Sequence, residues 1–146
     1  MSWTNQLGPS LGLLVMRLLT GGMLIYGHGW PKLMNWSERM TTFADPIGLG
    51  SIVGFWLVVL VEVPCSVLVM LGWLTRFACL LPIGFFLVAA FIQHWADPFG
   101  RKELPLLYLA CYVCLLFAGP GRFSVDAMRG ARRERGWGEV QSWTRT

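Results

Sequence analysis

The stretch SIVGFWLVVLVEVPCSVLVMLGWL, residues 51–74, decides the fold, because it is almost entirely apolar and carries one formal charge, Glu62. A helix needs about 20 predominantly apolar residues to cross the hydrocarbon core of a bilayer. Three more runs have this character: residues 11–30 hold one charge, Arg17, and residues 77–93 and 104–118 hold none. The sequence therefore predicts an all-α integral membrane protein, a bundle of four transmembrane helices at about 11–33, 51–74, 77–94 and 104–119.

The overall composition argues against several classes of protein. Of the 146 residues, 55% are hydrophobic and 14% are charged, and the mean hydropathy is +0.54. A water-soluble domain usually has about 25% charged residues, so a soluble enzyme, a coiled coil and a nucleic-acid-binding protein are all disfavoured. The net charge of +4 comes largely from a basic tail, residues 127–146. We therefore expect the lipid bilayer, and no nucleic acid, as a partner.

The distribution of Lys and Arg predicts how the bundle is oriented. Four spans place both termini, together with the turn at Thr75-Arg76, on one side of the membrane. That side holds seven Lys or Arg residues, and the other side holds four. Because cytoplasmic segments carry an excess of positive charge, both termini are predicted to be cytoplasmic, with residues 1–126 forming the membrane domain.

Arg17 and Glu62 are the two charges that the predicted spans place inside the bilayer. A charge at the centre of a membrane helix costs roughly 2.5–3.5 kcal/mol on insertion scales, so each side chain is expected to have a partner. From their depths along the first two spans, we expect them to contact each other. The pair either fixes the packing of two helices or forms a polar site for a quinone head group, a proton or a small anion.

A second polar group lies at the ends of the spans that face away from the termini. It comprises Tyr26, His28 and Lys32 at the end of the first span, His94 and Asp97 at the end of the third, and Glu103 at the start of the fourth. Histidine beside a carboxylate is suited to metal binding or to proton exchange near neutral pH. The alternative is that these residues simply meet water and lipid head groups. No pair has the helical spacing of metal ligands, so we predict no metal site.

The motif Cys111-Tyr112-Val113-Cys114 allows two interpretations. A C-x-x-C pair in a membrane bundle is suited to thiol–disulfide exchange, here with a quinone. The motif lies inside an apolar helix, however, and no Lys, Arg or His is nearby in sequence to lower a thiol pKa. Packing as small apolar side chains is therefore the favoured interpretation.

Taken in order along the chain, these motifs resemble the DoxX family of small bacterial membrane proteins. The residues that carry the resemblance are Arg17, His28-Gly29-Trp30-Pro31-Lys32-Leu33, Glu62, Leu71-Gly72-Trp73-Leu74-Thr75-Arg76, His94, Glu103 with Leu107-Tyr108, and Gly119-Pro120-Gly121-Arg122-Phe123-Ser124-Val125-Asp126. The resemblance covers about residues 10–128. It implies a multi-pass, four-span bundle in the bacterial inner membrane, related to the membrane subunit of thiosulfate:quinone oxidoreductase. The pair Cys111 and Cys114 is not part of the family pattern.

The resemblance also implies roles for the polar residues. Arg17 and Glu62 would form a polar pocket within the bundle. The residues at the outer face would form a binding or proton-handling group: His28, Lys32, His94 and Glu103. The candidate catalytic residues among these are Glu62, His28 and His94. On the cytoplasmic face, Arg76 matches a family motif, and Arg122 and Asp126 would clamp the final turn.

The leading functional hypothesis is a redox-associated membrane subunit that acts near the quinone pool with a thiol or sulfur-type donor. The sequence has no haem, flavin or iron–sulfur motif, so no intrinsic cofactor is expected, and electron transfer requires a quinone and a soluble or membrane redox partner. Two alternatives stay open: a non-catalytic membrane anchor or assembly subunit whose basic tail engages a partner, and a small-solute transporter with Arg17 and Glu62 at its core. The sequence leaves open whether the chain is itself catalytic and what its oligomeric state is.

Overall fold

The computed structural model describes residues 7–131, and within this range all regular structure is helical. Three of the helical segments are π-helical, with i→i+5 hydrogen bonds, and carry the symbol η. In chain order the elements are α1 (Leu7–Leu24), η2 (Ile25–Gly29), α2 (Trp30–Met34), α3 (Trp36–Arg39), α4 (Ser51–Leu60), η3 (Val61–Cys65), α5 (Ser66–Leu71), α6 (Thr75–Val88), η4 (Ala89–Gln93) and α7 (Phe99–Ala118). Most of the basic tail, residues 132–146, lies outside the described residues.

Three continuous helices are long and apolar enough to cross a membrane: Leu7–Met34, Ser51–Leu71 and Thr75–Gln93. They correspond to the first three spans expected from the sequence. The fourth helix, α7, has 20 residues, but its start carries Arg101, Lys102 and Glu103. Its uncharged part is limited to residues 104–118, so the fourth span stays a prediction.

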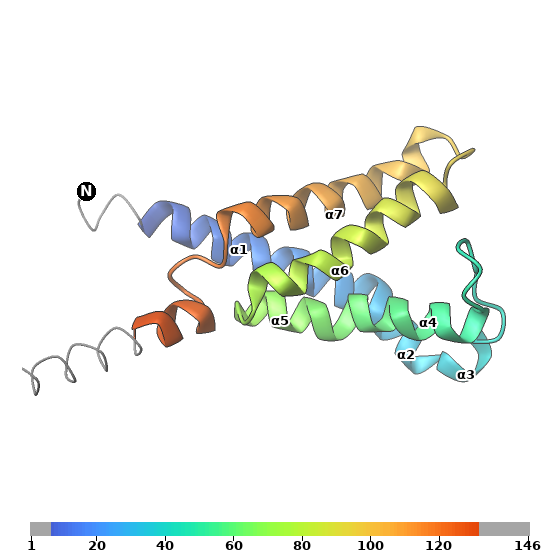
Figure 1. Cartoon of the computed structure of the whole chain (residues 1–146), viewed down its shortest axis with the longest axis horizontal. Coiled ribbons are helices and arrows are strands. Elements are labelled where there is room, and N and C mark those ends of the chain that lie inside the picture. Colours follow the sequence, from blue (N-terminus) through green and yellow to red (C-terminus); the bar gives the residue numbers. More distant parts are fainter. Residues whose placement is uncertain (1–6, 132–146) are drawn as a thin grey trace, which may run out of the picture.

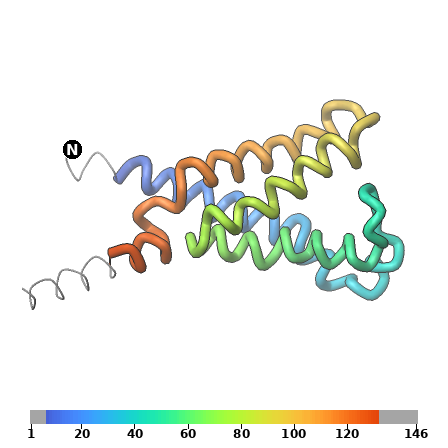
Figure 2. The backbone as a smooth tube through the Cα atoms, in the orientation of Figure 1, coloured from blue at the N-terminus to red at the C-terminus, as the bar shows by residue number. Residues whose placement is uncertain are grey.

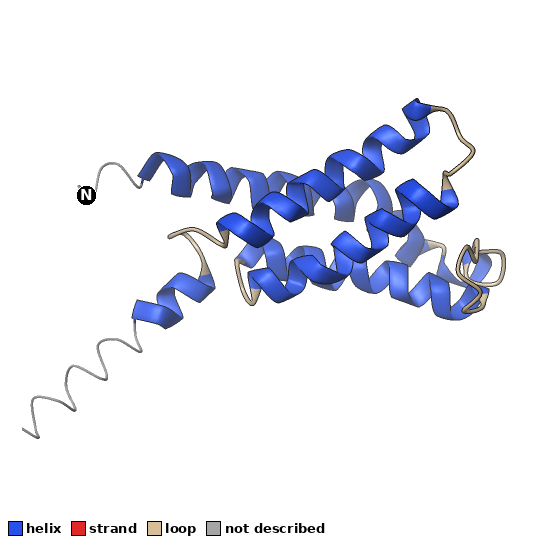
Figure 3. Ribbon diagram, turned by 45° about the horizontal axis from the view of Figure 1, so that its top comes forward, coloured by secondary structure: helices blue, strands red, loops and turns tan. Residues whose placement is uncertain are grey.

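The helices form a bundle with two distinct ends (Figure 1). The turn between α5 and α6 lies at one end, together with the start of α1 and residues 125–131, and we call this the terminal end. Residues 40–50 and 94–98 lie at the opposite end, the loop end. The tube in Figure 2 shows how the chain passes back and forth between the two ends. Figure 3 shows the same helices turned by 45°, with α6 beside α7, a pair that packs closely.

Glycines set the register between the first helix and the second. A Cβ atom built on Gly21 would lie 2.5 Å from Cγ of Met70, and one on Gly29 would lie 2.5 Å from Cγ2 of Val63. Neither position has room for a larger side chain, which is typical of close helix packing in membranes. The antiparallel register therefore places Gly29 opposite residues 62–63, and residue 17 opposite the turn at Gly72.

Aromatic side chains form the centre of the core between α6 and α7. The ring of Phe86 stacks on Tyr108 at a centroid distance of 5.1 Å and on Tyr112 at 5.9 Å. Tyr112 is fully buried, and its hydroxyl lies 3.3 Å from the hydroxyl of Ser66. This hydrogen bond satisfies two polar groups in an apolar environment, where an unpaired hydroxyl is costly.

Large apolar side chains cover the outside of the bundle. Leu11, Phe77 and Phe117 are 54%, 73% and 77% exposed, and many other Leu, Ile, Val, Met and Trp side chains are exposed as well. An apolar surface of this extent is not stable in water. The surface therefore confirms a membrane-integral protein whose outer side chains face lipid.

Candidate functional site

Each of the three long apolar helices contains one π-helical segment, and all three segments contribute to the same region. The segment η2 contains His28, η3 contains Glu62, and η4 ends at Gln93. A π turn adds one residue to the helical turn and changes the direction of nearby side chains, and such turns are frequent at functional sites. Pro64 explains η3, because proline has no N–H to donate within a helix. Nothing in the local sequence explains η2 and η4.

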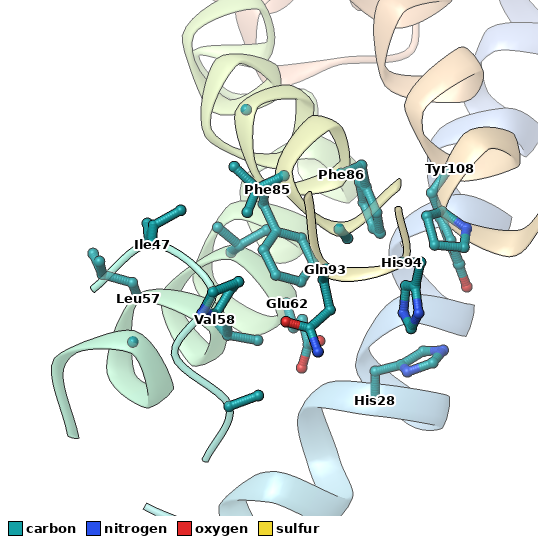
Figure 4. Close-up of a pocket in the computed structure, with 18 of the residues that line it drawn as sticks. His28, Ile47, Leu57, Val58, Glu62, Phe85, Phe86, Gln93, His94 and Tyr108 are labelled. Atoms are coloured by element: carbon teal, nitrogen blue, oxygen red, sulfur yellow. The ribbon is translucent and has the colours of Figure 1, made fainter. Parts of the chain in front are cut away.

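The three π-helical segments border a cavity of about 800 Å³ (Figure 4). Its walls come from the first, second and third helices, from α7, and from the loop at residues 43–49. Most of the lining is apolar or aromatic. The polar and charged side chains in the lining are His28, Lys32, Asp45, Glu62, Gln93, His94, Arg101 and Tyr108. The cavity therefore combines an apolar chamber with a small number of polar groups, as small-molecule sites do.

An ion pair between Lys32 and Glu62 lies in the cavity wall. Nζ of Lys32 is 2.7 Å from both carboxylate oxygens of Glu62. The side chain of Glu62 is 3% exposed and that of Lys32 is 14% exposed. The lysine also lies 3.5 Å from the carbonyl oxygen of His28, one helical turn earlier. Both charges are thus neutralised, which is the condition for keeping them inside a membrane protein.

This pairing corrects the contact expected between Arg17 and Glu62. In the antiparallel register Glu62 faces residue 29, which is 12 residues beyond Arg17 along the first helix. At a rise of about 1.5 Å per residue, this separates the two charges by roughly 18 Å along the helix. Lys32, near the end of the first helix, is the basic residue within reach of Glu62. The prediction of one pocket built from Arg17 and Glu62 is therefore wrong.

Arg17 instead lies at the terminal end, where it is completely buried. One of its terminal nitrogens, Nη2, donates a hydrogen bond to the carbonyl oxygen of Phe123. Its Nε and Nη1 have no hydrogen-bond partner among the described residues. A Cβ on Gly72, which adopts φ +70°, would overlap the guanidinium group. Arg17 thus holds the chain that follows α7 against the α5–α6 turn.

Asp126 fixes the same turn from the other side. Its carboxylate accepts hydrogen bonds from the backbone N–H groups of Leu74 at 2.9 Å and Thr75 at 3.0 Å, and from the Thr75 hydroxyl at 3.1 Å. Its own N–H donates to the carbonyl oxygen of Gly72 at 2.9 Å. Partial burial opposes ionisation, but these hydrogen bonds outweigh it and hold the pKa of Asp126 below its usual range. They also secure Leu74, a non-glycine residue at φ 49°.

The other two residues expected at this end are on the surface. Arg76 and Arg122 are both exposed, and a Cβ on Gly119 would lie 3.6 Å from the guanidinium of Arg76. Arg17 is the buried arginine at the final turn, and the clamp expected between Arg122 and Asp126 stays a prediction.

His94 forms a hydrogen-bonded pair with Asp97 at the loop end. Nδ1 of His94 is 2.7 Å from a carboxylate oxygen of Asp97, and the other oxygen lies 3.4 Å from Arg101. The hydrogen bond from His94 holds the pKa of Asp97 below its usual range, and the charge of Arg101 acts in the same direction. The second histidine, His28, packs edge-to-face against the ring of Tyr108 at a centroid distance of 6.3 Å.

The structure brings most of the predicted outer-face group together, with one exception. His28, Lys32 and His94 line the same cavity as Glu62, whereas Glu103 is exposed and is not among the described residues that line it. Sequence reasoning missed Gln93, although it is the single polar residue near the end of the uncharged run 77–93. It also missed the loop at residues 43–49, for which the sequence gives no comparable signal.

The cysteines divide by exposure. Cys65 and Cys79 are buried, Cys111 is half-buried and Cys114 is exposed, and all four are free thiols. Cys65 and Cys79 pack within the bundle, whereas Cys114 lies on its outer surface, and the interpretation of Cys111 and Cys114 as small apolar side chains stays a prediction. Among residues 7–131, no three His, Cys, Asp or Glu side chains are grouped so as to hold a metal ion.

Comparison with known proteins gives two similarities. The family model DoxX matches residues 12–95. The inner membrane protein YqjF of Escherichia coli (strain K12) is 29% identical over 124 residues, which cover 81% of this chain and 92% of that protein. No solved structure is significantly similar. The matched residues 12–95 include most of the cavity wall, with His28, Lys32, Glu62 and His94.

Proposed function

The chain belongs to the DoxX family, and on this premise we propose that it is a redox-associated membrane subunit whose cavity binds the head group of a quinone. The observation that carries the proposal is the buried Lys32–Glu62 ion pair in the wall of an apolar cavity of about 800 Å³. An ionisable pair at this depth is costly to keep in a membrane protein, and such residues usually mark a functional site.

The cavity has the chemistry that a quinone head group requires. A quinone is a flat, apolar ring with two carbonyl oxygens that accept hydrogen bonds. The aromatic rings of Phe85, Phe86 and Tyr108 line the cavity and offer apolar and ring-edge contacts to it. The ammonium group of Lys32 is a donor for a carbonyl oxygen, and Glu62 balances its charge. In this proposal the electrons come from a thiol or sulfur-type donor through a partner protein, since the sequence contains no haem, flavin or iron–sulfur motif.

The proposal includes the membrane topology. The chain crosses the inner membrane of a bacterium four times, with α7 as the fourth span and both termini in the cytoplasm. The excess of Lys and Arg at the terminal end, once the basic tail is counted, supports this orientation. The similarity to a protein named for the inner membrane supports the location. The cavity then lies near the outer face of the membrane.

A second candidate, a membrane anchor for a soluble partner, rests on a different observation. Arg17 and Asp126 fix the segment after α7 to the α5–α6 turn, so the basic tail leaves the bundle from a defined position. An anchor of this kind needs the terminal end and does not need the cavity. Truncation after residue 131 would release the partner of an anchor while leaving quinone binding unchanged.

Quinone binding by the purified chain tests the first proposal directly. Isothermal titration with a short-chain ubiquinone in mild detergent should show saturable binding by the wild-type protein. Glu62→Gln should weaken it at least tenfold, because Lys32 then carries an uncompensated charge. Glu103→Gln is the matched control, since this glutamate is exposed and outside the cavity. Thermal unfolding of each variant shows whether it is folded.

Two results would refute the proposed site. One is a wild-type protein that is folded but shows no saturable quinone binding. The other is equal weakening, or none, in Glu62→Gln and Glu103→Gln. If binding is confirmed, quinone reduction with thiosulfate or a thiol donor should require a co-purifying partner, and the same pair of variants then tests whether the cavity is used in turnover.

A further inference from the structure

The quinone site proposed above does not use the hydrogen-bonded pair His94–Asp97, which lies at the edge of the cavity. His94 follows η4 directly and lines the cavity, and Asp97 is three residues later. Both side chains are partly accessible, at 31% and 29% exposure. Asp97 is not among the described residues that line the cavity. The pair thus connects the cavity with the aqueous side of the loop end.

The hydrogen bond determines which nitrogen of His94 carries the proton. An ionised carboxylate only accepts hydrogen bonds, and the pKa of Asp97 is held low by the bond itself. Nδ1 of His94 is therefore the donor, at 2.7 Å. In the neutral imidazole this leaves the lone pair on Nε2, on the ring edge that is turned away from Asp97. Figure 4 shows the imidazole of His94 extending toward the helix that carries His28.

We propose that His94 is a proton acceptor for a hydroxyl group of the hydroquinone or phenol type in the cavity, with Asp97 as its positioning residue. The proposal rests on the function proposed above and adds a proton path to it. The O–H bond of the ligand breaks, its electron pair stays on the oxygen, and an N–H bond forms at Nε2. The imidazolium then releases its proton to water at the loop end. Reduction of a quinone, the direction of the proposed function, uses the reverse sequence, in which the imidazolium delivers its proton to the oxygen of the bound ligand.

The surroundings of His94 favour it over the other groups of the cavity. The charged or titratable side chains that share the cavity are His28, Lys32, Asp45, Glu62, Arg101 and Tyr108. Glu62 uses both oxygens for Lys32. A proton on His28 would face the like charge of Lys32 one turn away. The carboxylate of Asp97 lies 3.4 Å from Arg101 and 2.7 Å from Nδ1 of His94. Because Asp97 is closer to His94, His94 is the histidine whose imidazolium form has a carboxylate partner.

A nitrophenol whose ionised form absorbs visible light is a direct probe of this proton transfer. Bound to the wild-type protein, it should lose its proton at lower pH than the free compound, because His94 accepts the proton. An opposite charge within about 4–6 Å shifts a pKa by roughly one to three pH units. The ionisation midpoint of the bound probe should therefore rise by about one pH unit, a tenfold change in the proton equilibrium, in Asp97→Asn and in His94→Gln.

The controls separate this inference from the proposed function. Glu103→Gln should leave the midpoint unchanged, and Asp97→Asn keeps the imidazole in case His94→Gln does not fold. A merely structural role of the pair would change the affinity for the probe but not its ionisation midpoint. Quinone binding with equal midpoints in all four proteins would overturn the inference alone. Absence of both quinone and nitrophenol binding by the folded wild-type protein would overturn the proposed site and the inference together.

Discussion

Replacing the lysine of the Lys32–Glu62 ion pair should lower the free energy of unfolding by an amount that follows from the structure. In Lys32→Met the Glu62 carboxylate, 3% exposed, loses its only described partner for both oxygens. Breaking a buried ion pair on one side usually costs about 3–5 kcal/mol. The carboxyl group can instead take up a proton, which removes the buried charge. For a glutamate with an ordinary pKa of about 4.3, protonation at pH 7 costs about 3.7 kcal/mol, which sets an upper limit to the loss.

The same reasoning predicts how the stability of Lys32→Met depends on pH, and this dependence shows whether the unpaired Glu62 carboxylate causes the loss. In Lys32→Met the folded protein binds a proton that the unfolded chain does not, so its stability rises as the pH falls. The loss should shrink from about 3.7 kcal/mol at pH 7 to about 1.6 kcal/mol at pH 5.5. In Lys32→Met/Glu62→Gln neither charge of the buried pair is left, and we expect at least about 2 kcal/mol of the loss to be recovered.

Reversible unfolding in mixed micelles, followed by the fluorescence of the eight tryptophans, measures these differences. Lys102→Met is the matched control, because Lys102 is at the same end and donates to the carbonyl oxygen of Trp95, with no buried carboxylate partner among residues 7–131. Its loss should stay below about 1 kcal/mol. A loss below about 1 kcal/mol in Lys32→Met at pH 7, or a loss that does not change with pH, would show that Glu62 is hydrated and that the buried-pair reasoning is wrong.

Three further predictions concern the rest of the molecule. Asp126→Ala should cost about 1–2 kcal/mol at pH 7, as for loss of a helix cap. Because the pKa of Asp126 lies below its usual range, this difference from wild type should begin to shrink as the pH falls below about 4 and be lost as the pH falls through the folded-state pKa; a difference in unfolding free energy that is as large at about pH 2 as at pH 7 would contradict this. Gly29→Ala should destabilise the protein by about 1–3 kcal/mol through overpacking. Gly27→Ala is the control: it lies in the same π-helical segment with open space around it, and it should be neutral or slightly stabilising. Similar changes in unfolding temperature for the two variants would exclude the close packing at Gly29. In detergent, a maleimide should label Cys114 in the folded protein and Cys79 only after unfolding, as mass spectrometry of the labelled chain will show; early labelling of Cys79 would contradict its burial.

The sequence alone predicted the membrane helices, because the ability of a segment to cross a bilayer depends on its own length and apolarity. Residues 51–74 and 77–94 were predicted within a few residues of the helices Ser51–Leu71 and Thr75–Gln93. The gathering of His28 and His94 at one end also follows from the sequence, since successive helices run in opposite directions. Both histidines then reach the loop end without any knowledge of packing.

Side-chain partners could not be read from the sequence in the same way. The prediction paired Glu62 with Arg17, the nearest opposite charge in a span, but the partner is Lys32. The choice depends on how far the first helix slides along the second, and Gly21 and Gly29 set that position by allowing close contact with Met70 and Val63. This register is a property of two packed surfaces, and neither segment contains it alone.

The same distinction applies to both ends of the molecule. The sequence showed that Asp126 lies in a polar turn after the last helix, but only the fold places its carboxylate on the backbone N–H groups of Leu74 and Thr75, about 50 residues earlier. At the loop end, the fold alone adds residues 43–49 to the cavity wall. Hydrophobicity is local and therefore readable along the chain, whereas hydrogen bonds, ion pairs and cavities join distant residues and are decided by tertiary packing.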